Sequence, residues 1–248
     1  MKSYVLEVCV DSVESAIAAE KGGATRLELC SDLIIGGTTP TLELFYMVQE
    51  KTGLPVHVLI RPRYGDFLYS GNEYELMCRQ IKSFAEAGAD GVVIGSLNED
   101  GTLNEEQMSG MIKAACSMKI TFHRAFDVTS NPLEALAAAR RLGVDIILTS
   151  GQCQSCIEGK ELIKELLAES GDMDILIGGG VKAEVIEDFI RETDARCFHM
   201  SGKEVLESGM KYRNTKVNMG IPGISEFEIL RTSEQQISDA AAVLEKFC

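Results

Sequence analysis

One stretch near the start of the chain decides the fold: YVLEVCVDSVESAIAAEKGGATRLELC, residues 4–30. Two β-rich runs, Tyr4–Val10 and Arg26–Cys30, flank a segment with helical periodicity. Asp11-Ser12 supplies a helix cap before that segment, and Gly23 suits the left-handed residue that ends a helix. A strand, a helix and a second strand in this order predict two parallel strands joined by a crossover helix.

The same unit recurs along the chain. The further β-rich runs are Val56–Arg61, Gly91–Gly95, Ile120–His123, Ile146–Thr149, Asp174–Ile177 and Arg196–Met200. They follow one another at intervals of about 20 to 35 residues, with helical patterns between them. Eight repeats favour closure into a TIM (β/α)8 barrel, an α/β fold that typically takes about 250 residues in one domain. An open, doubly wound sheet is the alternative.

Glycines indicate which turns lie on the N-terminal face of this barrel. Gly23, Gly88 and Gly143 each follow a helical pattern and precede a strand, so these turns lie on the N-terminal face. The opposite strand ends then carry any chemistry. We expect a single domain over residues 1–248, with a long loop after the eighth strand at residues 203–232 and a last helix at residues 233–247. A loop of that length is expected to cover the barrel mouth or to contact another subunit.

Charge and hydropathy exclude several classes of partner. The formal net charge is −14, and no run is rich in lysine or arginine, so nucleic acid and anionic membranes are not expected partners. No stretch approaches the roughly 20 apolar residues of a membrane span, and the first residues lack a signal-peptide core. We therefore expect a cytoplasmic protein whose eight cysteines are reduced thiols.

Polar residues within the strands are predicted to face the barrel interior. One face of each strand packs under helices and must be apolar, which assigns the direction of the remaining side chains. By this rule the interior holds Glu7, Arg26, Glu28 and Arg61, and Arg63 follows Arg61 on the same face. These groups must pair with one another, because an unpaired buried charge destabilises the fold strongly. The network would line a functional pocket; a closed ion-pair cluster that only fills the barrel is the alternative.

Two of the three histidines, His123 and His199, lie at the ends of predicted strands, at positions whose side chains are expected to face the barrel interior. Together with Glu7 and Glu28 they indicate acid/base chemistry, for which imidazole is suited near neutral pH. Satisfied core histidines are the alternative. His57 begins a strand at the opposite end of the barrel and is interpreted as structural.

Glycines and arginines at the strand ends predict an anion site. Gly178-Gly179-Gly180 follows the seventh strand and Ser201-Gly202-Lys203 follows the eighth, where barrels of this type commonly bind phosphate through backbone N–H groups. Arg61 and Arg63 add guanidinium groups suited to carboxylate or phosphate. A tight turn is the alternative interpretation of the glycine triplet.

Two pairs of cysteines are candidates for binding a soft metal ion. Cys9 and Cys30 face inward from adjacent strands, and Cys153 and Cys156 form a CxxC in the loop after the sixth strand. Thiolates suit Cu(I). A free cysteine is also a common buried apolar residue, and a single CxxC lacks the four ligands of a structural zinc site.

Several motifs carry a family resemblance. They are Leu6-Glu7-Val8-Cys9, Arg26-Leu27-Glu28-Leu29-Cys30, Gly36-Gly37-Thr38-Thr39-Pro40, Arg61-Pro62-Arg63-Tyr64-Gly65-Asp66-Phe67, Phe122-His123-Arg124-Ala125-Phe126-Asp127, Leu148-Thr149-Ser150-Gly151 and Gly178-Gly179-Gly180. In this order, over nearly the whole chain, they resemble the CutC family. The resemblance implies a TIM barrel, a cytoplasmic homodimer or homotetramer, and a role in copper homeostasis with Cu(I) held by Cys9 and Cys30. Thr38 stands where members commonly have leucine, and Cys153 and Cys156 lie outside the pattern.

Hypotheses of three classes follow. The first is a copper-handling protein that binds Cu(I) through Cys9 and Cys30. The second is an enzyme acting on a small phosphate- or carboxylate-bearing substrate, with Glu7, Glu28 or His123 moving a proton and Asp127 orienting His123 or a substrate hydroxyl. Its anion-binding residues would be Arg26, Arg61, Arg63, Ser150, Gly178, Gly179, Gly180, His199 and Ser201. The third is an interaction scaffold that uses residues 203–232.

Overall fold

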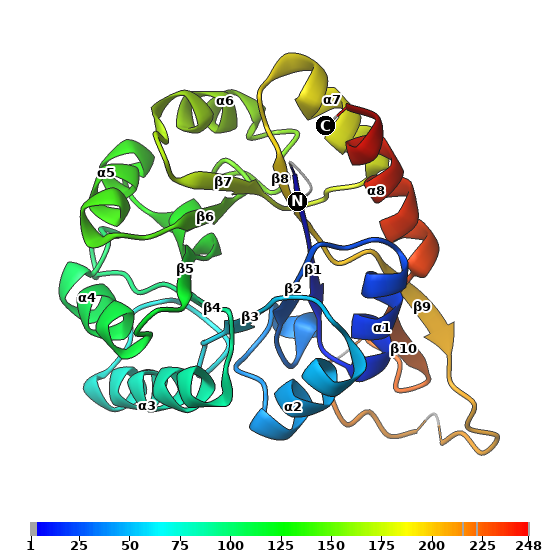
Figure 1. Ribbon diagram of the computed structural model, residues 1–248. Helices are drawn as coiled ribbons and strands as arrows, with labels where there is room; N and C mark the ends of the chain where they lie inside the picture. Colours follow the sequence, from blue (N-terminus) through cyan, green and yellow to red (C-terminus); the bar gives the residue numbers. More distant parts are fainter. Residues whose placement is uncertain (1–3, 215, 222, 248) are drawn as a thin grey trace.

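The computed structural model describes residues 4–214, 216–221 and 223–247. Its centre is a closed barrel of eight parallel strands in sequence order, surrounded by helices (Figure 1). The strands are β1 (Val5–Val10), β2 (Arg26–Leu29), β3 (Val56–Leu59), β4 (Gly91–Ile94), β5 (Lys119–Phe122), β6 (Ile146–Thr149), β7 (Asp174–Ile177) and β8 (Cys197–Met200). Each lies within two residues of a predicted run, and the predicted TIM barrel is confirmed.

Helices alternate with the strands along the chain. They are α1 (Val13–Lys21), α2 (Leu42–Lys51), α3 (Gly71–Ala87), α4 (Glu105–Ala114), α5 (Pro132–Leu142), α6 (Lys160–Glu169), α7 (Ala183–Glu192) and α8 (Glu234–Phe247), with short 3-10 helices η1 (Leu33–Ile35) after β2 and η2 (Arg124–Val128) after β5. Ser12 caps α1 as predicted, and Asn131 caps α5; each side chain accepts a backbone N–H of the first turn. Gly88 and Gly143 end α3 and α5 with φ of 87° and 80°, which confirms their assignment to the turns before β4 and β6.

The main hydrophobic core lies between the barrel and the helices. Outward-facing strand residues such as Leu6, Val8 and Leu27 are fully buried there, as the parity rule predicts. Inside the barrel, one apolar group comes from β6, β7 and β8 (Ile146, Leu148, Leu176 and Cys197). A second comes mainly from β2, β3 and β4 and includes Cys30, Leu59 and Val93. The remaining interior is polar.

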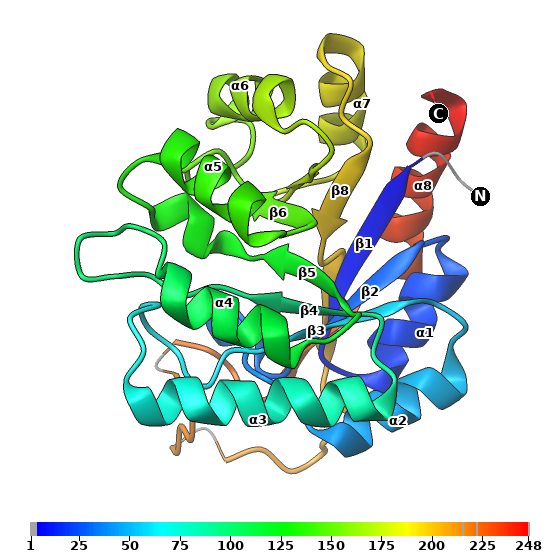
Figure 2. The ribbon, with the colours of Figure 1, turned by 60° about the vertical axis from the view of Figure 1, so that its left-hand side comes forward.

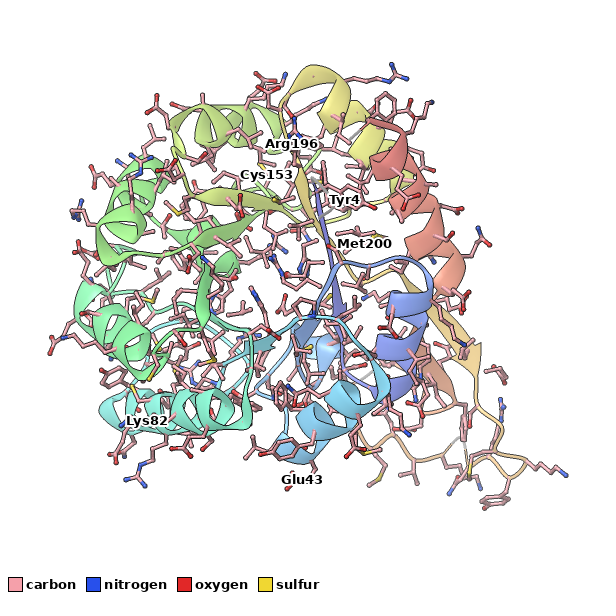
Figure 3. The ribbon with its side chains drawn as sticks, viewed as in Figure 1. Tyr4, Glu43, Lys82, Cys153, Arg196 and Met200 are labelled. Atoms are coloured by element: carbon pink, nitrogen blue, oxygen red, sulfur yellow. The ribbon has the colours of Figure 1, made fainter. Side chains whose placement is uncertain are left out.

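Closure of the barrel brings the first and last strands together. The N–H of Val5 donates to the carbonyl of Arg196 at 2.9 Å, and Figure 3 shows Tyr4 and Arg196 beside each other at the starts of β1 and β8. All eight strands run in one direction around the barrel (Figure 2), so their C-terminal ends gather at one face. No helix among the described residues is long and apolar enough to cross a membrane.

Residues 203–232, which we call the arm, differ from the predicted loop. The arm begins and ends with two further strands, β9 (Lys203–Glu207) and β10 (Glu228–Thr232), which pair antiparallel. The register places apolar residues opposite each other, Leu206 with Ile229 and Val205 with Leu230, and sets Arg231 opposite Glu204. The arm lies beside α1, outside the ring of helices; the part after β9 projects away from the barrel, and the part before β10 returns to it (Figure 1). There Met219, Ile221 and Ile224 line a pocket with Ile34 and Ile35 of the loop after β2.

Candidate functional site

Four charged side chains from β1, β2 and β8 meet inside the barrel. Glu7 lies opposite Arg26 in the pairing of β1 with β2, and opposite His199 in the pairing of β1 with β8. One carboxylate oxygen of Glu7 accepts from Arg26 Nε at 2.5 Å, and the other lies 2.8 Å from His199 Nδ1. Glu28 Oε2 lies 3.3 Å from the same Nδ1. We call Glu7, Arg26, Glu28 and His199 the β1–β2–β8 cluster, and their predicted inward direction is observed.

Burial and mutual charge shift the pKa values of this cluster. Burial alone would raise the pKa of Glu7, but Arg26 and His199 together hold it well below its usual range. Burial raises the pKa of Glu28 to about 7, although His199 opposes this rise. Burial lowers the pKa of His199, but the nearby Cys9, Glu28 and Glu7 outweigh it, and the net direction is well upward. These directions favour an ionised Glu7 beside a protonated His199.

Two buried thiols lie above this cluster. Cys9 pairs with Glu28 between β1 and β2, and Cys30 directly follows β2, two residues after Glu28; both thiols are buried. The thiol of Cys30 donates to the Val10 carbonyl at 3.5 Å, and that of Cys9 donates to the Met200 carbonyl at 3.7 Å. Burial, with a contribution from the nearby Cys9, raises the pKa of Cys30 well above its ordinary value. The structure thus brings the two predicted metal ligands to one side of the barrel.

Arg61 does not join the β1–β2–β8 cluster, contrary to the prediction. Its guanidinium donates to the carbonyls of Ile35, Gly37 and Gly65, at 3.4, 3.0 and 2.8 Å. No carboxylate pairs with Arg61 within the described part of the chain, and its buried Nε lacks a hydrogen-bond partner there. The side chain follows the loop after β2, and the carbonyl groups of that loop take the place of the expected carboxylates.

His123 is buried at the end of β5 and is bound to its own backbone. Its Nδ1 accepts the N–H of Ala125 at 3.1 Å and so caps η2, while its ring packs on Phe67 with centroids 4.9 Å apart. Its Nε2 is buried without a hydrogen-bond partner among the described residues. Burial, and then the positive charge of Arg61, lower the pKa of His123 to about 3. This imidazole is a neutral helix cap, which argues against its predicted role in moving a proton.

The Asp127 carboxylate makes no hydrogen bond to His123 within the described chain, and its other predicted role, orienting a substrate hydroxyl, stays a prediction. Its carboxylate accepts from the hydroxyl groups of Thr149 and Ser150 and from the backbone N–H of Ser150 and Gln152. It also pairs with Arg124 at 2.7 Å. Asp127 therefore ties η2 to the loop after β6.

Ser150 belongs to the same network. Its hydroxyl oxygen lies 2.9 Å from Asp127 Oδ2 and 2.7 Å from the Cys153 carbonyl, either of which can accept its single proton, and it accepts from Arg124 at 2.7 Å. These bonds occupy the hydroxyl within the protein. The anion-binding role predicted for Ser150 therefore stays a prediction without support from its contacts.

Arg63 lies at the rim of the barrel, not in its interior as the parity rule predicted. Its guanidinium pairs with Glu73 at 2.5 Å and with Asp66 at 3.0 Å, and its side chain is 36% exposed. Glu73 is also part of the capping box of α3. The alternation of the strand does not extend to Arg63 because β3 ends at Leu59.

The loop after β7 packs closely against the loop after β6, and the end of β8 is bonded to β10. Gly179 and Gly180 have φ of 88° and 85°, and the Gly179 carbonyl accepts the N–H of Cys156 at 2.9 Å. A Cβ at Gly179 would lie 2.8 Å from the Ser150 side chain. The Ser201 carbonyl accepts from the Thr232 hydroxyl at 3.3 Å, which joins the end of β8 to β10. The glycine triplet thus forms a tight turn, and its binding of an anion stays a prediction.

The CxxC cysteines are separated from the barrel interior. Cys156 is fully buried in the main core, and burial raises its pKa to about 11. Cys153 is partly exposed near α6, and its carbonyl is bound by Ser150 (Figure 3). The pair forms part of the turn that joins β6 to α6.

Two glycines, Gly91 at the start of β4 and Gly95 directly after it, make room for histidine rings at the neighbouring strands. A Cβ at Gly91 would lie 2.6 Å from the His57 ring, and one at Gly95 would lie 2.5 Å from the His123 ring. His57 lies 3.5 Å from the Thr121 hydroxyl, and burial lowers its pKa to about 4. Its predicted structural role fits these contacts.

Comparison with known proteins decides the family. The model of the CutC family matches residues 4–204. The chain belongs to the CutC family. A protein named copper homeostasis protein cutC homolog from Mus musculus is 44% identical over 88% of this chain and 80% of its own length. A homologue of the same name from Homo sapiens is 41% identical over 97% of this chain and 89% of its own length. The resemblance stated from the motifs is confirmed.

Solved structures agree with this assignment. A crystal structure of a protein named as copper homeostasis protein CutC, from Streptococcus agalactiae, superposes with a TM-score of 0.75. It is 30% identical, and the match covers 80% of this chain and 98% of that one. The 2-keto-3-deoxy-6-phosphogluconate aldolase of Zymomonas mobilis, at 14% identity and a TM-score of 0.55, shares the fold alone.

Some residues that shape this CutC-family interior escaped the sequence interpretation. In the sequence analysis Gly91 and Gly95 were only the first and last residues of a β-rich run. Glycine in such a run can, however, indicate that another part of the chain approaches the strand closely. Arg124 was visible only as part of a motif, but its spacing of three residues from Asp127 is that of an ion pair on one helical turn.

Proposed function

We propose that the protein takes part in copper homeostasis by binding Cu(I) through Cys9 and Cys30. The observation that carries the proposal is the placement of two free, buried thiols on the inner faces of adjacent strands. Sulfur ligands select Cu(I) over harder ions. The names of the relatives from mouse and human support the same role.

The surroundings of the two thiols suit a soft monovalent ion. The Cys30 thiol makes a long hydrogen bond to a backbone carbonyl at 3.5 Å, and the Cys9 thiol makes one at 3.7 Å and also contacts His199; a thiol is a weak donor. Little hydrogen bonding is lost when Cu(I) replaces their protons. Apolar Leu59 and Val93 pack with Cys30 and keep water from that side.

Competition with a chromophoric Cu(I) chelator tests this proposal under anaerobic, reducing conditions. We expect the double variant Cys9→Ser, Cys30→Ser to bind Cu(I) at least about 100-fold more weakly than the unaltered chain, because hydroxyl groups are poor ligands for Cu(I). The matched control is Cys153→Ser, Cys156→Ser, for which we expect unchanged affinity. Equal affinity of the unaltered chain and the Cys9, Cys30 variant would refute the proposal.

We also propose a cytoplasmic homodimer or homotetramer in which the arm contacts a second subunit. Free thiols remain reduced in the cytoplasm. Support for the contact comes from large apolar side chains of the arm that are strongly exposed, such as Tyr212 at 76% and Met219 at 84%. Light scattering should show a smaller assembly for Tyr212→Ser, Met219→Ser. An unchanged mass would remove the arm from the interface.

A second candidate function is catalysis on a small anionic substrate. The observation that favours it is Arg61, a buried guanidinium at the C-terminal strand ends without a carboxylate partner in the described chain. A buried positive charge of this kind is stabilised by an anion. Calorimetry with inorganic phosphate and with oxalate should detect binding that Arg61→Met abolishes. If neither anion binds, this candidate loses its support.

A further inference from the structure

We propose that Glu7, Glu28 and His199 form a binding site for a divalent first-row transition-metal ion, separate from the thiol ligands proposed for Cu(I). Ligand atoms of these three side chains lie within 4.8 Å of one another, and they form the one such group of three or more residues found within the described chain. The side chains come from β1, β2 and β8, and the strands therefore hold them rigidly.

The distances within this group are those between ligands on one metal ion. His199 Nδ1 lies 2.8 Å from Glu7 Oε1 and 3.3 Å from Glu28 Oε2. Two adjacent ligands on an ion with bonds of about 2.1 Å are about 3.0 to 3.4 Å apart in octahedral or tetrahedral geometry. An ion can replace the proton at Nδ1 with little movement of the three side chains.

Glu28 supplies the independent sign of a missing ligand. Its side chain is only 8% exposed, and its Oε2 has no hydrogen-bond partner among the described residues; His199 Nδ1 lies nearer to Glu7, at 2.8 Å, than to Glu28, at 3.3 Å. A buried carboxylate oxygen without a partner is costly to the fold. A cation bound between Glu28 and His199 would remove that cost.

The chemistry of the three ligands selects the class of ion. One imidazole nitrogen and two carboxylate oxygens suit Mn²⁺, Fe²⁺ or Zn²⁺, whereas Mg²⁺ and Ca²⁺ prefer oxygen alone. Arg26 binds the other oxygen of Glu7 and fixes the direction of that carboxylate. With neutral imidazole the four side chains sum to −1, so a divalent ion brings the site to +1. That charge favours an additional small anion or hydroxide on the ion.

Mn²⁺ is the appropriate probe because it binds thiolates poorly, and electron paramagnetic resonance measures the free ion directly. We expect one site per chain that is clearly tighter than the weak binding of a protein with net charge −14. Glu28→Gln should weaken binding at this site at least tenfold, since it removes one anionic ligand without changing the shape of the side chain. His199→Asn, which removes the nitrogen ligand, should do the same and serves as the second variant if Glu28→Gln does not fold.

Two controls separate this site from other carboxylates and from the thiols. Glu75→Gln alters an exposed ion pair with Arg79 on α3 and should leave Mn²⁺ binding unchanged. Cys30→Ser removes the thiol that donates to the Val10 carbonyl, and it should also leave Mn²⁺ binding unchanged while weakening Cu(I) binding. The site is refuted if Mn²⁺ binds equally well to the unaltered chain and to folded Glu28→Gln or His199→Asn, or if the cysteine variant loses it. Failure of Cu(I) binding alone would leave this result intact.

Discussion

Two groups of polar side chains face inward near the barrel, and they differ in what compensates their charge. In the β1–β2–β8 cluster, Glu7 is held by Arg26 and His199, so carboxylates compensate cations. At the ends of β3 and β5, backbone carbonyls hold Arg61, and His123 is neutral and caps a helix. The first group can exchange a proton or a cation, whereas the second mainly fixes loops. Residue type and inward direction alone do not distinguish these roles.

The largest expected effect comes from breaking the charge compensation of the first group. Glu7→Gln leaves Arg26 nearly buried without its carboxylate, and removing one partner of a buried pair costs about 3 to 5 kcal/mol. Urea denaturation at pH 7 would measure the loss. The exposed pair of Glu75 and Arg79 provides the matched control, for which Glu75→Gln should cost less than about 0.5 kcal/mol. Equal losses at both sites would remove the difference between interior and surface pairs.

An effect of intermediate size is expected from the pH dependence of the second group. Below the ordinary pKa of 6.5 the unfolded chain protonates His123, while the folded chain keeps it neutral down to about pH 3. The contribution of His123 to the free energy of unfolding is therefore fully present above pH 6.5. It decreases by about 1.4 kcal/mol for each unit by which the pH drops below that value. Asparagine can still accept the Ala125 N–H, so His123→Asn should reduce the total loss between pH 6.5 and 4.5 by about 2.7 kcal/mol. Parallel stability curves for the two proteins would contradict the neutral state of His123.

The smallest effect is expected at the rim. Asp66 is 73% exposed and shares Arg63 with Glu73, so Asp66→Asn should lower the free energy of unfolding by less than about 1 kcal/mol. Thermal unfolding at low and at high salt measures this change and should show that it shrinks as salt rises. A loss as large as that of Glu7→Gln would mean that Arg63 belongs energetically with the interior charges.

The strands and most inward directions could be predicted because they depend on local periodicity. Glu7, Glu28 and His199 lie within regular strands, where alternation determines the face. Arg61 and Arg63 follow the end of β3, where alternation no longer applies. Their partners belong to loops: the Gly37 carbonyl for Arg61 and the Glu73 carboxylate for Arg63. Loop conformation is not encoded in a periodic pattern, so these contacts could not be predicted.

Asp127 and the arm show two further limits. Asp127 binds Ser150, which is 23 residues away, because η2 contacts the loop after β6, and nothing in either segment indicates the other. In the arm, β9 and β10 are short strands separated by 20 residues, so neither resembled one half of a hairpin. Contacts of this kind become visible only once the barrel has closed.

Gly91 and Gly95 have a consequence for how the family can vary. Imidazole rings occupy the space that side chains at positions 91 and 95 would need: the His57 ring beside Gly91 and the His123 ring beside Gly95. The size of each space therefore depends on two residues from different parts of the chain. A larger residue at either glycine is tolerated only if the matching histidine becomes smaller. Positions 91 and 57, and positions 95 and 123, should therefore change together among members of the family.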